Sequence, residues 1–194
     1  NCDWSSDVCS SDLGYLDTRV RGERVPNVET GRIDLHYTFR EGELNYVERI
    51  LIRGNAVTKD KVIRRELVIL PGDVYNTVRV ERSRERVENL GFFSDVETSP
   101  YPTEVENRKD LVITVDEKKT GSMTFGAGFS SIDNLIGFVE IQQGNFDLFN
   151  WGNFTGGGQK LRTRIQLGFE RQDYLLSFTE PWFMDRKLAL GVDL

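Results

Sequence analysis

The stretch Leu161-Arg-Thr-Arg-Ile-Gln-Leu-Gly-Phe169 decides the fold, because largely apolar positions alternate with polar or glycine positions along it. A period of two places one set of side chains on each face of a β-strand. The same alternation returns over residues 188–194. The polar set is charged and rich in glycine, which indicates a wet face, whereas the other set needs a protein core or lipid. Residues 121–194 are therefore predicted to form a β-sheet with one wet face and one apolar face.

The composition of the chain changes at about Thr120. Of the first 120 residues, 42 are charged and 7 are glycine, whereas of the last 74 residues 14 are charged and 11 are glycine. Two domains with different surroundings explain this shift better than one continuous core. The formal net charge of −6, without a compact basic stripe, argues against nucleic acid as a partner.

The apolar solvent of the C-terminal sheet could be lipid. No run of the sequence approaches the ~20 apolar residues of a transmembrane helix. Open sheet edges are excluded from lipid, so membrane strands here would have to belong to a closed barrel. Such strands give a weak hydropathy signal, so a mean hydropathy of −0.43 is compatible with them. No signal peptide begins at Asn1, and an exported protein needs one, so we expect the chain to be cut at both ends.

Residues 1–13 are rich in Ser and Asp and contain both cysteines, Cys2 and Cys9. A small disulfide loop or half a metal site is one interpretation, but a metal site lacks its other ligands. We prefer the interpretation that this segment is not native, because it resembles translated sequencing-adapter sequence. It is therefore left out of the fold prediction.

Two segments of the chain match at a separation of about 76 residues. The sequence Gly14-Tyr-Leu-Asp-Thr-Arg-Val20 parallels Gly91-Phe-Phe-Ser-Asp-Val-Glu97. The sequence Arg32-Ile-Asp-Leu-His-Tyr-Thr-Phe-Arg-Glu41 parallels Arg108-Lys-Asp-Leu-Val-Ile-Thr-Val-Asp-Glu117. Each pair reads as strand, loop and strand, and only the second copy has a front half. A repeat of this size predicts tandem small domains, the first of them truncated.

The complete copy contains three predicted strands. Residues 46–52 form the first, and residues 95–99 and 111–115 form the last two. Pro100 and Pro102 follow the second strand, and proline is confined to sheet edges because it cannot donate to a ladder. We therefore expect 95–99 to lie at the edge of the sheet and 111–115 to be central.

Two helices are predicted between the first strand and the last two. Thr58 is placed to cap a helix that continues to about Leu67. Asn76 is placed to cap a second helix, with an apolar stripe along one side, and Gly91 lies just past its end. The element order is therefore β-α-α-β-β.

This order, the repeat and the following sheet resemble the BamA family of outer-membrane protein assembly factors. The most specific motifs are Asn89-Leu-Gly-Phe-Phe-Ser-Asp-Val96, Gly121-Ser-Met-Thr-Phe-Gly-Ala-Gly-Phe129, Gln142-Gln-Gly-Asn-Phe146 and Ser177-Phe-Thr-Glu-Pro-Trp-Phe183. The resemblance implies an α+β POTRA domain followed by the opening antiparallel strands of a transmembrane β-barrel. It assigns the parts as follows: 14–43, the C-terminal half of a POTRA domain; 44–119, a complete POTRA domain; 121–194, the first four to five barrel strands.

The resemblance and the alternation together predict three sets of site residues. Clients are expected to pair with a POTRA edge formed by Asp95, Val96, Glu97, Thr98 and Ser99. The seam strand of the barrel is expected to present Ser122, Thr124, Gly126 and Gly128. The predicted lipid-facing residues are Met123, Phe125, Phe129, Leu161, Ile165, Leu167, Phe169, Leu188, Leu190 and Val192.

Aromatic side chains gather at the predicted strand ends. They are Phe146, Phe149, Trp151, Phe154, Trp182 and Phe183. An ordinary sandwich core would also collect aromatic residues, but the strand pattern favours a girdle at the membrane interface. The segment of about residues 144–158 departs from the family pattern, because a periplasmic turn is usually short.

Three other features carry a less specific signal. Gly126 and Gly128 either leave room for packing inside a barrel or weaken a seam strand, and the sequence does not decide between the two. The run Gly156-Gly-Gly-Gln-Lys160 lacks the ending and the helix of a phosphate loop, so a flexible turn is predicted there. His36 has no marked nucleophile or acid beside it, which predicts a surface or interface histidine.

By resemblance, the protein receives unfolded barrel proteins from the periplasm and inserts them into the bacterial outer membrane. The expected partners are unfolded outer-membrane proteins, outer-membrane lipid and accessory lipoproteins. No cofactor is implied, and no constellation of residues indicates an enzyme. Two alternatives stay open at this point, a two-partner secretion or TamA-like transporter and a soluble, adhesin-like binding module with a β-sandwich.

Overall fold

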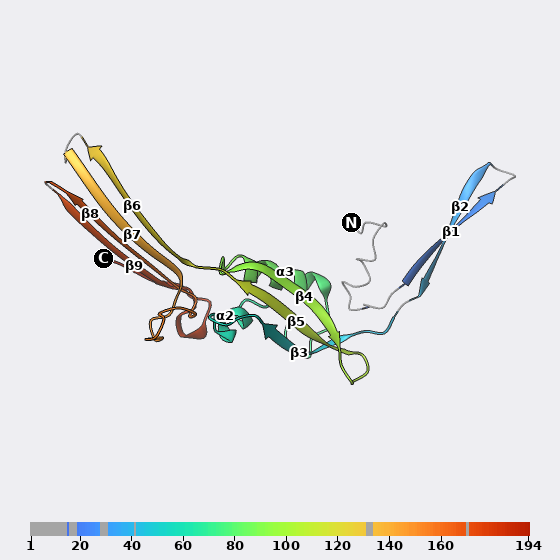
Figure 1. Ribbon diagram of the computed structural model, residues 1–194. Helices are drawn as coiled ribbons and strands as arrows, with labels where there is room; N and C mark the ends of the chain where they lie inside the picture. Colours follow the sequence, from blue (N-terminus) through green and yellow to red (C-terminus); the bar gives the residue numbers. More distant parts are fainter. Residues whose placement is uncertain (1–14, 16–18, 28–30, 41, 131–133, 170) are drawn as a thin grey trace. The chain divides into compact units, whose positions relative to one another are not determined.

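The computed structural model describes residues 15, 19–27, 31–40, 42–130, 134–169 and 171–194 (Figure 1). The interpretation of residues 1–13 as non-native, with Cys2 and Cys9, lies outside these residues. The chain divides into two compact units. The first consists of the described residues of Asn1–Arg53, Leu67–Arg86 and Glu97–Thr114, and the second of those of Gly54–Glu66, Val87–Val96 and Val115–Leu194.

The N-terminal part of the first unit is a β-hairpin. Strands β1 (Arg19–Asn27) and β2 (Arg32–Arg40) pair antiparallel, with Gly22 opposite Tyr37. The strand-loop-strand pattern of the incomplete repeat is therefore present. Its assignment to half a POTRA domain stays a prediction.

A three-stranded sheet follows, in the order β3-β5-β4 (Figure 1). Its strands are β3 (Tyr46–Arg53), β4 (Phe93–Pro102) and β5 (Arg108–Glu117). Strand β3 runs parallel to β5, with Ile52 opposite Ile113. Strand β5 lies between the other two and buries four consecutive side chains from Asp110 to Ile113. Consecutive side chains of a strand point to opposite faces, so both faces are covered here, which explains why this strand is so apolar.

The two predicted helices are α2 (Asp60–Arg64) and α3 (Thr77–Glu88). Asn76 caps α3 as predicted, since its Oδ1 accepts from the Arg79 N–H at 2.9 Å. The prediction for α2 is wrong at both ends. Its N-cap is Lys59 rather than Thr58, without a side-chain hydrogen bond, and the helix ends at Arg64. The β-α-α-β-β order itself is confirmed.

Apolar side chains are buried in both units. The buried apolar residues of the first unit are Val47, Ile50, Ile69, Tyr75, Val80, Leu111, Val112 and Ile113. Those of the second unit are Val62, Ile63, Val87, Phe92, Phe93, Val96 and Val115. No helix among the described residues is both long enough and apolar enough to cross a membrane.

The second unit continues into a five-stranded antiparallel sheet, in the order β10-β9-β8-β7-β6 (Figure 1). Its strands are β6 (Gly121–Ser130), β7 (Asn134–Phe146), β8 (Gln159–Gly168), β9 (Gln172–Glu180) and β10 (Leu190–Asp193). A short 3₁₀ helix, η1 (Phe183–Asp185), lies between β9 and β10. Each strand pairs with the next in sequence, which is the topology of an up-and-down barrel wall.

The register of this sheet separates its two faces. Phe125 lies opposite Val139, Val139 opposite Ile165, and Ile165 opposite Tyr174. On the other face, Glu140 lies between Thr124 and Arg164. The predicted alternation therefore gives one apolar face and one polar face across the sheet.

Candidate client-binding edge and strand-end cluster

Strand β4 is an edge strand of the three-stranded sheet. Within the described part of the chain its single strand neighbour is β5. An edge strand presents a row of backbone groups that an extended segment can pair with. The residues predicted to pair with clients, Asp95–Ser99, lie in the middle of β4. Their edge position follows from the strand order, and client pairing stays a prediction.

The opposite edge of the same sheet, β3, is partly occupied. The Val47 N–H donates to the Asp73 carbonyl at 2.8 Å, and the Gly72 N–H donates to the Val47 carbonyl at 2.7 Å. The Tyr75 N–H also donates to the carbonyl of Asn45 at 2.8 Å. This segment covers the start of β3, so β4 offers the longer open edge.

The side chains of the predicted client edge have different environments. Asp95, Glu97 and Ser99 are exposed, Thr98 is half-buried and Val96 is 2% exposed. The side chain of Val96 therefore belongs to the core. Only the backbone of Val96 is available to a client, so probes of this edge belong at Glu97 and Ser99.

Strand β6, the predicted seam strand, has β7 as its single neighbour among the described residues. The predicted seam residues share the polar face: Ser122, Thr124, Gly126 and Gly128. A Cβ at Gly126 would lie 2.6 Å from the ring of Phe138, so this glycine leaves room for packing. A Cβ at Gly128 would have no atom within 4 Å, so packing does not explain Gly128.

The predicted lipid-facing residues share the apolar face of the sheet wherever they lie on strands. Met123, Phe125 and Phe129 of β6 are 66%, 79% and 87% exposed. A contiguous patch of exposed large apolar side chains marks a surface for a membrane or a protein partner, so lipid contact stays a prediction here. The rest of this set on strands is Leu161, Ile165, Leu167, Leu190 and Val192. Phe169 follows the end of β8, and Leu188 lies in the turn before β10 rather than on a strand.

Among the predicted interfacial aromatics, Trp182 is set apart by polar and charged partners near α2. Phe146 and Phe154 stack with ring centroids 6.0 Å apart, and Trp151 lies 6.4 Å from Phe154. Trp151 and Phe149 are 84% and 78% exposed, and Phe183 is 37% exposed. A membrane girdle stays a prediction for these residues. Trp182 differs from them, because it has protein partners just after the end of α2, Arg65 and Glu66.

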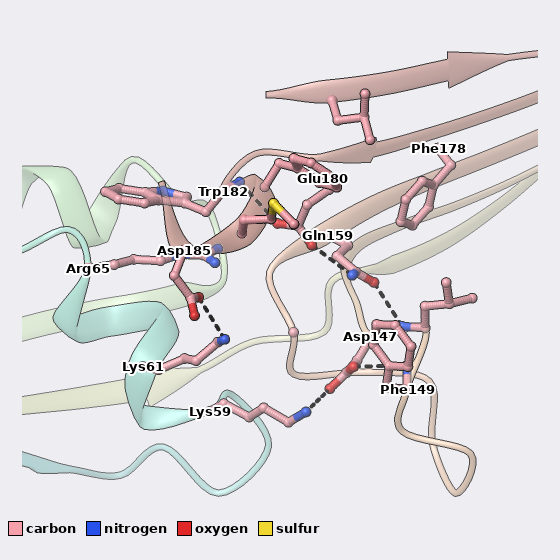
Figure 2. A pocket seen from close by; sticks show the side chains of 15 residues that line it. Lys59, Lys61, Arg65, Asp147, Phe149, Gln159, Phe178, Glu180, Trp182 and Asp185 are labelled. Carbon is pink, nitrogen blue, oxygen red and sulfur yellow. Dashed lines mark hydrogen bonds and ion pairs between the residues drawn. The ribbon is translucent and has the colours of Figure 1, made fainter. Parts of the chain in front are cut away.

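Trp182 is part of a cluster that the sequence did not predict (Figure 2). We call it the strand-end cluster: the α2 segment (residues 54–66), the β7–β8 turn (residues 147–158) and the β9–β10 connection (residues 181–189), all in the second unit. The Trp182 Nε1 donates to the Glu66 carboxylate at 2.9 Å, and the Arg65 guanidinium lies 5.6 Å from the centre of the Trp182 ring. Two ion pairs reinforce the cluster, Lys59–Asp147 at 2.5 Å and Lys61–Asp185 at 2.8 Å.

Two glycines allow the β7–β8 turn to approach the α2 segment, and a third allows the turn to fold closely on itself. Gly156 and Gly158 have φ values of 102° and 76°. A Cβ at Gly156 would lie 2.2 Å from the Val57 carbonyl oxygen, and one at Gly158 would lie 2.5 Å from Arg65 Nη2. A Cβ at Gly157 would lie 2.9 Å from the side chain of Asp147. The glycine run therefore permits close packing in this turn, and the predicted flexibility of the turn stays a prediction.

A polar network joins the same parts. The Lys59 N–H donates to the Gly156 carbonyl at 2.9 Å. Asn145 donates from Nδ2 to Thr58 Oγ1 at 2.9 Å and accepts at Oδ1 from the Gly158 N–H at 2.8 Å. Asn145 is 3% exposed, so each of its hydrogen bonds is made away from water. The amide of Asn145 therefore fixes both segments at once.

Glu117, at the end of β5, accepts hydrogen bonds from the two residues that precede the N-cap of α2, and Thr58 is one of them. Its carboxylate accepts from the N–H groups of Val57 and Thr58 at 2.8 and 2.6 Å. Burial acts to raise the pKa of Glu117, but hydrogen bonds from Thr58, Val57 and Ala56 together outweigh burial and lower the pKa. The ionised form therefore stabilises the start of the α2 segment.

We expect this stabilisation to depend on pH. Because the folded pKa of Glu117 is lowered, the contribution is fully present above the ordinary pKa of 4.5 and is lost as pH falls through the lower folded value. Replacing Glu117 by Gln should cost about 1–2 kcal/mol at pH 7 and little at acidic pH. Thermal unfolding of the full-length protein at several pH values measures the difference. An equal loss at all pH values would contradict the role of the charge.

Arg65 lies at the centre of the strand-end cluster. Its Nε and Nη2 are buried and have no hydrogen-bond partner among the described residues. Burial lowers the pKa of the Arg65 guanidinium, and the nearby carboxylates of Glu180, Glu66 and Asp185 act in the opposite direction. The guanidinium is held by these charges and by the Trp182 ring rather than by direct hydrogen bonds from those two atoms.

The described residues contain no group of three or more His, Cys, Asp or Glu side chains placed to hold a metal ion. His36 is exposed on β2. The features with structural support are therefore an open sheet edge, a two-faced strand array and the strand-end cluster.

Family comparisons identify both parts of this arrangement. Residues 45–118 match the POTRA family, described as a surface antigen variable number repeat, and residues 153–194 match the Omp85 superfamily domain. The chain thus has the domain pair of a class of outer-membrane proteins in which POTRA domains precede a barrel. The predicted fold class, a POTRA domain followed by opening barrel strands, is confirmed.

Within this class of outer-membrane proteins, the individual relatives of the chain are assembly factors. The chain is 30% identical over 183 residues to the outer membrane protein assembly factor BamA of Nitratidesulfovibrio vulgaris and 32% identical over 182 residues to that of Neisseria meningitidis. These alignments cover 94% and 93% of this chain and 22% of each relative. The crystal structure of BamA from Haemophilus ducreyi lacking POTRA domains 1–3 matches with a TM-score of 0.80 and 29% identity, covering 95% of this chain and 33% of that one.

The predicted resemblance to the BamA family is therefore confirmed. The chain spans about a fifth of the length of these curated relatives. The predicted location is confirmed as well: the strands belong to the bacterial outer membrane, and the POTRA domain lies in the periplasm.

Proposed function

We propose that this chain is part of a factor that assembles and inserts β-barrel proteins into the bacterial outer membrane. The observation that carries the proposal is the similarity to BamA over more than nine-tenths of the chain. The open β4 edge and the two-faced strand array are compatible with it. Unfolded outer-membrane proteins are the proposed clients, and accessory lipoproteins are proposed as further partners.

The first proposed step is capture of an extended client segment on β4. Backbone N–H and C=O groups would supply the binding, so the sequence of the client would matter little. The exposed side chains along this edge, Asp95, Glu97 and Ser99, would contact the client without specifying it. The core side chain of Val96 would hold the strand in place from behind.

The second proposed step uses β6. This strand carries glycine at positions 121, 126 and 128, and glycine weakens the interior of a strand. A weakly held first strand could separate from the last strand of the barrel. Its edge would then be free to pair with strands of a client. The apolar face of the sheet would meanwhile contact outer-membrane lipid.

A chimera tests the proposal. Residues 45–194 replace the aligned segment in BamA of Neisseria meningitidis, and native BamA is depleted from the cell. We expect folded barrel proteins of several kinds to persist in the outer membrane, measured by heat-modifiable mobility. A chimera that is stably inserted but restores no barrel protein would contradict the assembly function, as would export of a single secreted protein with no effect on barrels.

A further inference from the structure

A cavity of about 400 Å³ lies within the strand-end cluster (Figure 2). One side of it is apolar and belongs to the barrel strands. Phe178 and Leu190 line the cavity, and both lie on the apolar face of the sheet, where Phe178 is opposite Leu161 and Val192. The cavity is therefore continuous with the surface that an outer-membrane barrel turns to lipid.

The turns at the strand ends extend this apolar side. Phe149 from the β7–β8 turn and Met184 from η1 line the cavity and are 78% and 79% exposed. Exposed aromatic and thioether side chains at the end of a barrel strand match the interfacial region of a membrane. An acyl chain that lies along Phe178 and Leu190 would reach these two residues next.

Charged side chains also line the cavity, one of them Glu180 opposite Leu190, and the charges balance. Three cations line it (Lys59, Lys61 and Arg65), and so do three carboxylates (Asp147, Glu180 and Asp185). In the pair Lys59–Asp147 the carboxylate is buried, since the Asp147 side chain is 4% exposed, whereas the Lys59 side chain is 50% exposed. The pair Lys61–Asp185 is open, with side chains 63% and 75% exposed.

We propose that this cavity binds a phospholipid of the leaflet that faces the periplasm, with an acyl chain on the apolar side and a zwitterionic headgroup at the open ion pair. The headgroup phosphate would contact the Lys61 ammonium, and a headgroup ammonium would donate to the Asp185 carboxylate. A headgroup that carries both charges suits the open Lys61–Asp185 pair, since the ammonium of Lys61 and the carboxylate of Asp185 would each gain a group of opposite charge. A purely anionic headgroup would leave Asp185 facing negative charge.

Photocapture tests the site in the full-length protein. The protein is placed in phosphatidylglycerol vesicles that contain a trace of phosphatidylethanolamine with a photoreactive group in its acyl chain. We expect capture on peptides that contain Leu148 and Phe149 or Phe183–Asp185. The double variant Phe149→Ala with Lys61→Ala should reduce capture there by about fivefold, as expected for the loss of one aromatic and one ionic contact.

The control is a double variant at the other end of the same strands, Phe169→Ala with Arg171→Ala. Phe169 is 78% exposed like Phe149, and Arg171 forms an exposed pair with Asp173 at 2.7 Å, which matches the pair of Lys61. This variant should leave capture at the cavity unchanged. Heat-modifiable mobility of the barrel verifies that both variants are folded; if the cavity double variant is not folded, Phe149→Ala alone takes its place.

Two results would overturn the proposal. Equal capture at these peptides in the cavity variant and in the control would show that lipid meets the strand ends without using the cavity. Equal capture of a photoreactive phosphatidylglycerol, which lacks the ammonium, would refute the zwitterionic headgroup. Preferential capture of phosphatidylethanolamine that is lost in the cavity variant would support it.

Discussion

Replacing Gly156 by Ala is expected to separate the β7–β8 turn from the α2 segment. The new Cβ would lie 2.2 Å from the Val57 carbonyl oxygen, and the residue has a φ of 102°, which disfavours any side chain. The clash is with backbone, so a rotamer change cannot relieve it. We expect a local cost of about 2–3 kcal/mol, from strain and overpacking together.

Hydrogen exchange of the full-length protein measures this loss. The Lys59 amide donates to the Gly156 carbonyl, so its protection reports directly on the contact. A cost of 2–3 kcal/mol corresponds to exchange roughly 30- to 150-fold faster. Gly152→Ala is the matched control in the same turn, because its Cβ would meet only Asn150 Oδ1 at 3.7 Å. Unchanged protection in Gly156→Ala, or an equal loss in Gly152→Ala, would refute the close-packing role.

The strand-end cluster also illustrates where sequence reasoning is limited. The alternation from Leu161 to Phe169 predicts a strand because its period is local and each residue contributes to the signal. The cluster instead joins residues such as Thr58 and Asn145, which are 87 positions apart in the sequence. Nothing in the local pattern around either residue predicts the partner. The one available signal was the run of three glycines, which is compatible with flexibility as well as with close approach.

The capping error at Thr58 has the same origin. A threonine before a helix is a good local predictor of an N-cap. Here the carboxylate of Glu117, brought close by β5, accepts from the N–H groups that precede the helix, and Thr58 Oγ1 accepts from Asn145 instead. At Asn76 the local prediction is confirmed, because its Oδ1 accepts from the Arg79 N–H.

The sheet edge was predictable for a different reason. Pro100 and Pro102 cannot donate to a ladder, so they restricted the position of the strand that contains them. This constraint acts through the backbone and needs no knowledge of a distant partner. The strand order β3-β5-β4 agrees with it. The constraint does not predict which side chains of β4 are exposed. Because the Val96 side chain is buried, probes of the edge belong at other residues of the strand.

Proline substitution within β4 should have one of two effects, depending on the direction of the N–H group that it removes. At a position whose N–H points to the open edge it should weaken client capture, and at a position whose N–H points to β5 it should destabilise the sheet. Consecutive N–H groups of a strand point to opposite sides, so one of Glu97 and Thr98 donates toward β5 and the other toward the open edge. Proline at the inward position removes a ladder hydrogen bond and should cost about 3 kcal/mol of stability. Proline at the outward position should leave the sheet folded and weaken client pairing roughly fivefold or more, as expected for a lost backbone hydrogen bond.

Crosslinking in the full-length protein separates these effects. Photoreactive residues at Glu97 and Ser99, both exposed, should capture unfolded barrel proteins in cells, and the outward proline should reduce this capture while protease resistance of the POTRA domain is retained. Probes at the exposed helix positions Arg82 and Glu85 of α3 are the control, because a helix face cannot extend a sheet. Capture at α3 with none at Glu97 or Ser99 would exclude β4 as the client edge. Equal capture with and without the outward proline would show that clients meet this strand through side chains alone, in which case pairing along its backbone would not be the basis of recognition.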